Sequence, residues 1–157
     1  MNDYIYSIIL SMMPIAELRG GIPYALAHNI HPVTSYLMCC AANLLAFPIV
    51  YLFMGFLHDL FSKMEWYSRL FDKIVIRTRK KVGENIEKWG FWGLMVFVMI
   101  PLPVTGAYTG TFAAWLFDIQ KRKSFLAVSL GVLISGLIVS AVFLSGVELF
   151  SFFMKNV

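Results

Sequence analysis

The chain has 157 residues, of which 59% are hydrophobic and only 14% are charged, with a formal net charge of +4. Typical globular domains carry about a quarter charged residues, so this composition excludes an ordinary soluble domain. Residues 33–57 and 124–147 contain no charged side chain. Each run is longer than the roughly 20 apolar residues that cross a bilayer as a helix. The sequence therefore predicts an integral membrane protein.

The first apolar block, residues 4–27, is interrupted by a charged segment rich in glycine and proline, residues 14–23, which reads PIAELRGGIP. Pro14 and Pro23 are expected to end the flanking half-helices, because proline has no backbone N–H to donate. Gly20 and Gly21 would allow a sharp turn or the close approach of a ligand. The alternative is that these residues only form a tight hairpin.

The second block, residues 33–57, is predicted to cross the membrane without a break. Asn43 lies near its middle, where a side-chain amide should face the protein interior. There it can bond a hairpin tip, bind substrate or hold helices together. Cys39 and Cys40 are adjacent in this helix, a spacing that does not suit a disulfide, so we expect small packing residues.

A charged linker, residues 58–90, divides the chain into two halves. From Leu57 to Val75 apolar residues recur at spacings of three and four, with charged residues between them. This pattern predicts an amphipathic helix on the membrane surface. It either recognises anionic lipids, with the help of residues 79–81, or serves as a strut that joins the halves.

The third block, residues 91–117, is again interrupted, by residues 101–110, which read PLPVTGAYTG. Its candidate site residues are hydroxyl-bearing side chains beside glycines, namely Thr105, Gly106, Tyr108, Thr109 and Gly110, with Pro101 and Pro103 as helix breakers. The fourth block, residues 124–154, is unbroken. Each half is thus a broken block, a short loop and an unbroken block, which indicates an internal repeat within one membrane domain, residues 1–157. Broken segments in corresponding places of two halves point to the binding site of a membrane transporter.

The distribution of Lys and Arg favours broken blocks that enter the membrane and return on the same side. If all four blocks crossed, the linker and the loop 118–123 would lie on opposite sides, with eight and three basic residues. If the broken blocks are re-entrant, these eleven residues of the thirteen share one face. Positive residues collect on the cytoplasmic side, so the linker and this loop are expected inside and both termini outside.

Glu17 and Arg19 are the charged residues of the first tip. A charge at the bilayer centre costs at least about 2.5–3.5 kcal/mol on insertion scales, so such residues are candidates for function. Arg19 presents a fork of donors that suits phosphate or carboxylate. Glu17 could exchange a proton during transport, bind a cation or hold Arg19 in place. A pair that only neutralises both charges is the structural alternative.

The sequence contains no pattern that indicates an enzyme, a metal or a nucleotide cofactor. Zinc-protease, nucleophile-elbow, Rossmann and P-loop motifs are missing. His28 and His31 have no third ligand beside them in the sequence. The basic residues follow a membrane topology, so no nucleic-acid partner is expected. No cofactor and no metal are therefore predicted.

The two tips, residues 14–25 and 101–110, resemble the signature stretches of the putative small multidrug export protein family of prokaryotes. That family is similar to the DedA superfamily, also called the SNARE-associated or VTT group. The resemblance implies a plasma-membrane protein with two re-entrant hairpins in an inverted repeat. It further implies that the substrate is a lipid phosphate or another small amphipathic molecule. DedA proteins usually carry charges in both hairpins, whereas the second tip here has none.

The sequence thus predicts an all-helical membrane transporter in which each re-entrant hairpin is followed by a transmembrane helix. With two full spans there is little wall to enclose a pathway, so a homodimer in contact with membrane lipids is expected. The expected mechanism is alternating access at the tips. Efflux of lipophilic cations and a scaffold that transports nothing are the two alternatives.

Overall fold

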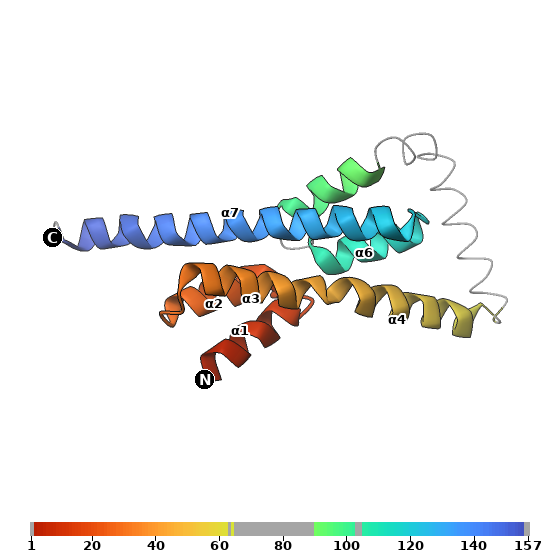
Figure 1. Ribbon diagram of the computed structural model, residues 1–157, viewed down its shortest axis with the longest axis horizontal. Coiled ribbons are helices and arrows are strands. Elements are labelled where there is room, and N and C mark those ends of the chain that lie inside the picture. Colours follow the sequence, from red (N-terminus) through yellow and green to blue (C-terminus); the bar gives the residue numbers. More distant parts are fainter. Residues whose placement is uncertain (1, 63, 65–89, 103–104, 156–157) are drawn as a thin grey trace.

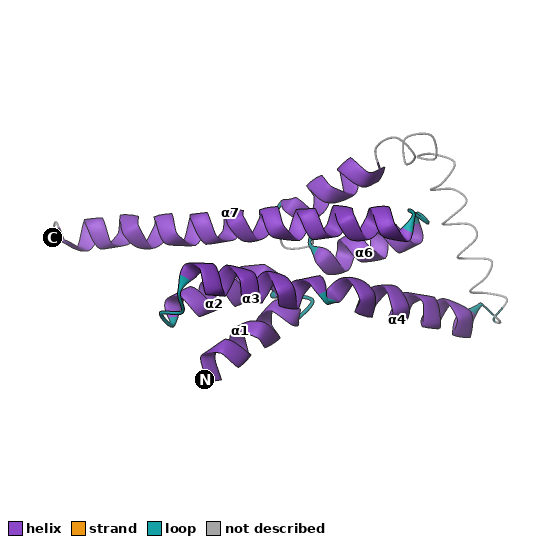
Figure 2. Cartoon of the chain, in the orientation of Figure 1, coloured by secondary structure: helices purple, strands orange, loops and turns teal. Residues whose placement is uncertain are grey.

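The computed structural model describes residues 2–62, 64, 90–102 and 105–155, and the regular structure in these ranges is entirely helical (Figures 1 and 2). The helices in chain order are α1 (Asn2–Met12), α2 (Glu17–Ala27), α3 (Pro32–Leu44), α4 (Ala46–Phe61), the unlabelled helix Gly90–Met99, α6 (Ala107–Leu116) and α7 (Lys121–Lys155). The all-helical class expected from the sequence is confirmed. The amphipathic helix expected in the linker falls mainly on residues 65–89 and lies outside the described residues.

Two helices are long and apolar enough to cross a membrane, Pro32–Phe61, which joins α3 and α4, and Lys121–Gly146 of α7. Only 33% and 39% of their most apolar windows are buried within the chain. The core helix of a soluble protein would instead hide most of such a window. The remaining apolar surface therefore needs lipid or another apolar partner, in agreement with a membrane protein.

The sequence predicted that the first of these helices is unbroken. In the structure it is divided at Leu45 into α3 and α4. Pro48 explains the division, because its ring lacks the N–H that would bond to the carbonyl of Leu44. The amide of Leu45 bonds instead to the carbonyl of Ala42, and that of Ile49 to Leu45. The break follows Asn43, whose side chain bonds to the end of α1.

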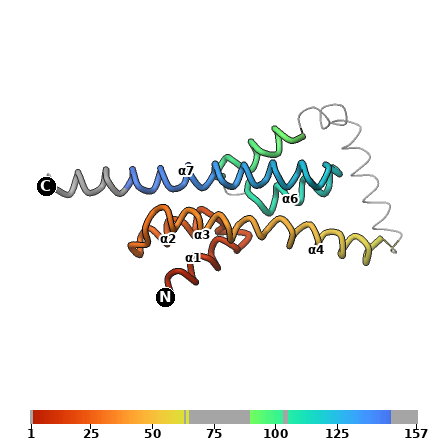
Figure 3. Tube along the Cα trace, viewed as in Figure 1, coloured from red at the N-terminus to blue at the C-terminus, as the bar shows by residue number. Residues whose placement is uncertain are grey.

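Each half of the chain folds as a helical hairpin followed by a long helix, and the halves interlock (Figures 1 and 3). The first hairpin is α1 with α2, and the second is Gly90–Met99 with α6. Helix α2 packs against α7 of the other half, and α6 packs against α4. The long helices run in opposite directions, so that α7 begins at the end of the molecule where α4 stops.

The two halves share their local geometry at positions 89 residues apart. Asn29 and Asp118 both adopt a left-handed backbone, with φ of 60° and 55°. One residue later, the amide of Ile30 bonds to Ala25 and that of Ile119 to Ala114, 3.1 and 3.0 Å away. The hydroxyls of Ser35 and Ser124, at the same spacing, donate to the carbonyls of Ile30 and Ile119. The two halves therefore make the same local bonds at these positions, and the internal repeat as a whole stays a prediction.

The cores of the halves differ in polarity. Ser7 and Ser11 of α1 and Asn43 of α3 are fully or almost fully buried. In the second half, buried Leu94 and Val98 lie against Gly110 as Ser7 and Ser11 lie against Gly21, and buried Val132 stands at the place of Asn43. The Ser7 and Ser11 hydroxyls donate to carbonyls within α1, and Asn43 donates from α3 to α1, whereas the second half is apolar at these places.

Candidate functional site

The two hairpin tips meet within one chain, near the middle of the molecule. The Tyr108 hydroxyl, on α6, donates to the carbonyl of Met12, the last residue of α1. The Arg19 guanidinium, on α2, donates to the carbonyl of Thr105 in the second tip. Each tip therefore binds the backbone of the other, and we call this contact between the tips the junction. A second subunit is not needed to bring the tips together.

Glu17 begins α2, but its side chain reaches the start of α6. One carboxylate oxygen accepts the amide of Tyr108 at 3.3 Å, and the side chain is 8% exposed. The residue before α6 is Gly106, which has no side chain to cap the helix. A carboxylate at a helix N-terminus meets unpaired amides and the positive end of the helix dipole. Glu17 therefore caps α6 from the other hairpin.

The backbone of Glu17 is strained, with φ of 47° in the left-handed region. Such a conformation costs a residue other than glycine on the order of 1 kcal/mol or more and persists where the surroundings impose it. Here the surroundings include the bond from Tyr108 and the buried position of the side chain. The strain lies at the residue that the sequence singled out for function.

The position of the Glu17 carboxylate leaves no room for a side chain at residue 106. A Cβ at Gly106 would overlap the carboxyl carbon and both oxygens of Glu17. This close approach of a backbone to a charged group is a reason for glycine that sequence spacing could not identify.

Arg19 is the more accessible member of the charged pair. Its guanidinium lies 3.8 Å from the Glu17 carboxylate, and its side chain is 25% exposed. The pairing that we considered as a structural alternative is therefore present. The same terminal nitrogen, Nη2, donates to the Thr105 carbonyl, and the fork of five donors has more groups than these two contacts use. Arg19 is thus both paired and partly open to a ligand.

The hydroxyls of the second tip are used mostly within the tip. That of Thr105 donates to the carbonyl of Ile100 and accepts the amide of Leu102 at 3.1 Å. That of Thr109 lies 3.5 Å from the carbonyl of Gly106. Thr105 thus holds the turn that follows Pro101 and presents its own carbonyl to Arg19. Pro103 and Val104 lie outside the described residues.

The expectation that Pro23 ends a half-helix is wrong, since Pro23 lies inside α2, which continues to Ala27. Pro23 cannot bond to the carbonyl of Arg19, four residues earlier, and its ring crowds that carbonyl, yet the helix continues past it. Pro14, by contrast, lies in the turn between α1 and α2. Pro101 likewise follows the end of the helix Gly90–Met99.

Gly20, Gly21 and Gly110 lie inside helices and serve hairpin packing. A Cβ at Gly21 would overlap the Ser11 hydroxyl and lie 2.8 Å from the carbonyl oxygen of Ser7. A Cβ at Gly110 would overlap Val98, and one at Gly20 would lie 2.8 Å from the Cβ of Ala16. Gly21 and Gly110 therefore bring the arms of their hairpins close together, and Gly110 also lies near Val128 of α7. Gly20 instead leaves room for Ala16, the residue that precedes its own helix.

Asn43 binds the end of the first hairpin, as an inward-facing amide should. Its side-chain amide donates to the carbonyl of Ser11 at 2.8 Å, and the residue is almost completely buried. The carbonyls in the last turn of a helix have no partner within it. Asn43 therefore supplies a partner to α1 one residue before its end.

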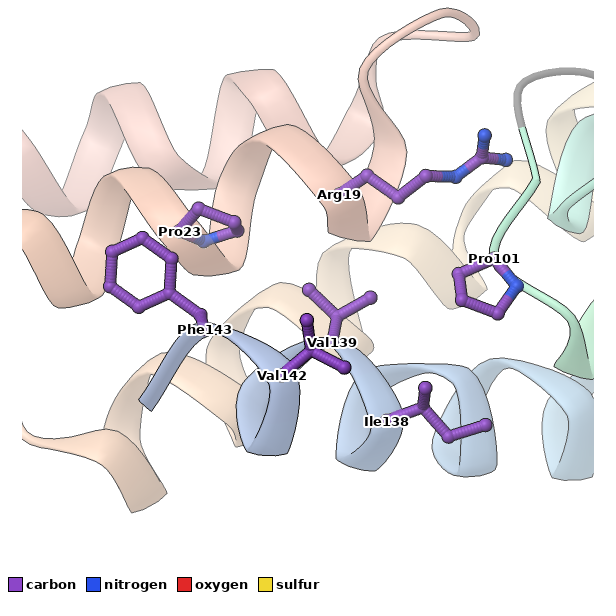
Figure 4. Close-up of a pocket in the computed structure, with 7 residues that line it drawn as sticks. All are labelled: Arg19, Pro23, Pro101, Ile138, Val139, Val142 and Phe143. Carbon is purple, nitrogen blue, oxygen red and sulfur yellow. The ribbon is translucent and has the colours of Figure 1, made fainter. Parts of the chain in front are cut away.

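A pocket of about 240 Å³ opens beside Arg19, between α2, α7 and the second tip (Figure 4). Its described lining consists of one cation and apolar side chains, namely Arg19, Pro23, Pro101, Ile138, Val139, Val142 and Phe143. Figure 4 shows the Arg19 side chain extending toward Pro101, with Phe143 and Pro23 toward the opposite end. The pocket therefore has a polar end and an apolar end.

The α7 residues of this pocket were not among the sequence candidates. Val142 and its neighbours belong to an apolar run in which lipid-facing and pocket-lining residues are chemically alike. The only signal that could have selected them is their distance along α7 from its start. No group of three or more His, Cys, Asp or Glu side chains that could hold a metal occurs among the described residues.

The region matched by a known family begins at Glu17 in the first tip and includes the second tip and part of the pocket wall. No curated protein and no solved structure matches the chain. A family model described as "Putative small multi-drug export protein" matches residues 17–138, from Glu17 at the junction to Ile138 in the pocket. The chain belongs to this small multi-drug export protein family.

Proposed function

We propose that the protein is a transporter that moves a small amphipathic anion, such as a lipid phosphate, across the plasma membrane. The observation that carries this proposal is the pocket beside Arg19, whose described lining is apolar apart from this one cation at one end. A phosphate or carboxylate head group would bind the free donors of Arg19. The hydrocarbon part would lie along Val139 and Val142 of α7.

The size and opening of the pocket suit a molecule that keeps its tail in lipid. About 240 Å³ is less than the roughly 300–1,000 Å³ of sites that enclose a drug-sized ligand. It holds a head group and the first part of a chain. Val142 at the pocket edge is 68% exposed on the apolar surface of α7, which offers a route to the bilayer.

The proposed arrangement in the membrane has both hairpins entering and leaving on the same side. Half-helices that end near the midplane leave irregular backbone there, which is tolerated only where protein or a wet cavity surrounds it. The contacts between the tips and Asn43 supply such surroundings. The start of α7 and the end of α4 lie at one end of the molecule, which fits an inside location for the loop 118–123 and the linker.

Proton coupling through Glu17 is part of the proposal. A charged carboxylate is favoured at the start of α6, and the uncharged acid interacts less strongly with the helix dipole. Protonation of Glu17 would weaken the junction between the tips and allow them to separate. Return of the charge would close the junction again.

Transport by the purified protein in liposomes tests the function, with a lipid phosphate and a cationic dye as separate substrates. Arg19→Ala and Arg19→Lys should both reduce lipid-phosphate transport at least about tenfold, because lysine lacks the bidentate fork. Arg122→Ala removes an exposed arginine at the start of α7 and serves as the matched control. It should leave the rate unchanged.

The same experiment separates the alternatives. Dye transport that Glu17→Gln abolishes and Arg19→Lys preserves would support cation efflux. Full activity of both variants with every substrate, in liposomes and in cells, would contradict a transport role for the junction and favour a scaffold.

A further inference from the structure

We propose that the contact between the two tips requires one carboxylate, which need not come from the first hairpin. A glutamate at position 106 can then replace the one at position 17. In this view Glu17 is a positioning residue. It holds the second tip where Arg19 can bind the Thr105 carbonyl and face the pocket. The inference rests on the proposed function only for its transport readout, because the assembly of the junction can be measured separately.

Glu17 and Gly106 hold equivalent places in the two halves. They are 89 residues apart, the same spacing that relates Asn29 to Asp118 and Ser35 to Ser124. Glu17 begins α2, and Gly106 directly precedes α6. The next residues, Leu18 and Ala107, are both buried. The two positions therefore face each other across the junction as counterparts.

Only one of the two positions can carry a side chain at a time. A Cβ on Gly106 would occupy the space that the Glu17 carboxylate fills. Conversely, removal of the Glu17 side chain leaves that space for a residue at position 106. A group that begins there starts beside Arg19, which lies 3.8 Å from the Glu17 carboxylate. A side chain at position 106 would also lie near the first residue of α2, where the helix dipole has its positive end.

The backbone favours the exchange at both positions. Glu17 has φ of 47°, a left-handed value that glycine adopts without strain. Gly106 has φ of 160° and ψ of −168°, an extended conformation that any residue adopts. The substitutions Glu17→Gly and Gly106→Glu would thus each be made on a compatible backbone. The native arrangement, in contrast, places the larger residue at the strained position.

Thermal unfolding of the full chain in detergent tests the inference through four proteins: native, Glu17→Gly, Gly106→Glu, and the double variant. Glu17→Gly loses the cap of α6 and Gly106→Glu adds an overlap, so each should lower the midpoint by about 3 °C or more. The double variant should recover to within about 2 °C of the native midpoint. Recovery by two individually harmful changes would show that positions 17 and 106 share one space at the contact between the tips.

A matched control distinguishes charge from filled space. Glu17→Gly combined with Gly106→Met places an unbranched apolar chain of similar length at the junction. It should remain at or below the midpoint of Glu17→Gly alone. Equal recovery with Gly106→Met and Gly106→Glu would overturn the inference, because packing would then explain the effect.

The other possible outcomes of the unfolding experiment also test the proposal. A double variant no more stable than Glu17→Gly overturns the proposal. If the chain with Gly106→Glu cannot be purified, Gly106→Asp in the Glu17→Gly background is measured by the same criterion, and failure of both overturns it. Recovery of stability without recovery of transport in liposomes leaves the inference standing and counts against proton coupling in the proposed function.

Discussion

Asn43 donates its side-chain amide to the carbonyl of Ser11, 2.8 Å away, and so joins the first long helix to the end of α1. Val132 occupies the corresponding place in α7, where no such bond can form. The bond to α1 is therefore specific to the first half, and its strength can be measured there.

Replacing Asn43 by Ala should lower the free energy of unfolding by about 1–3 kcal/mol, because a buried carbonyl loses its partner. Unfolding in a detergent titration measures this value. Leu37→Ala in the same helix is the control. Leu37 is 58% exposed, so its side chain meets lipid in a membrane and its loss should have little effect. Equal effects of the two substitutions would contradict the assigned role of Asn43.

Gly21→Ala should destabilise the first hairpin by about 1–3 kcal/mol, the usual effect of an added methyl group in a tightly packed contact. The new Cβ would meet the Ser11 side chain and, at 2.8 Å, the Ser7 carbonyl, whose backbone atoms cannot move aside easily. Gly55→Ala in α4 places a methyl group in open space. That control should be neutral or slightly stabilising, since alanine is the better helix former.

Val142→Trp should block transport while the protein remains folded. The indole would fill much of a pocket of about 240 Å³ next to Arg19. Leu137→Trp adds the same group at another exposed position of α7, and Leu137 does not line the pocket. Liposome transport should therefore fall at least about tenfold for the first variant and little for the second, because a ligand site works by enclosing most of the ligand's surface. Loss of transport in both would show that bulk on α7, not the pocket, matters.

Tyr36→Phe should weaken the contact between the long helices. The Tyr36 hydroxyl donates to the carbonyl of Leu133 at 3.1 Å. Side-chain bonds between membrane helices contribute about 0.6 kcal/mol on average and up to about 1.7 kcal/mol. Tyr51→Phe, which keeps the ring beneath the Lys121 ammonium, should change the unfolding free energy less. The same detergent titration compares the two.

The sequence predicts the tips well because their chemistry is unusual for a membrane interior. Charges at Glu17 and Arg19, with proline and glycine around them, have few explanations other than a break in a helix. The partners of these charges, the Thr105 carbonyl and the Tyr108 amide, are backbone groups, which carry no residue-specific signal.

Other features depend on three-dimensional neighbours and could not be predicted. Pro23 looked like a helix terminator, but the packing of α2 against α7 keeps the helix intact around it. Gly21 and Gly106 both lie in the broken segments, yet one faces its own hairpin and the other faces a carboxylate. The expected homodimer stays a prediction, because the contacts described above all lie within one chain.

The distance along the chain between Glu17 and its cap on α6 has a consequence for biosynthesis. The Tyr108 amide is made 91 residues after Glu17. At a translation rate of about 5–20 residues per second, the first hairpin waits roughly 5–20 s for this partner. During that interval Glu17 and Arg19 can pair with each other but not with the backbone of the second tip. A ribosome stalled before Tyr108 should therefore leave the hairpin outside the bilayer core. Stable insertion of the first half is therefore expected to follow, and not precede, synthesis of the second tip.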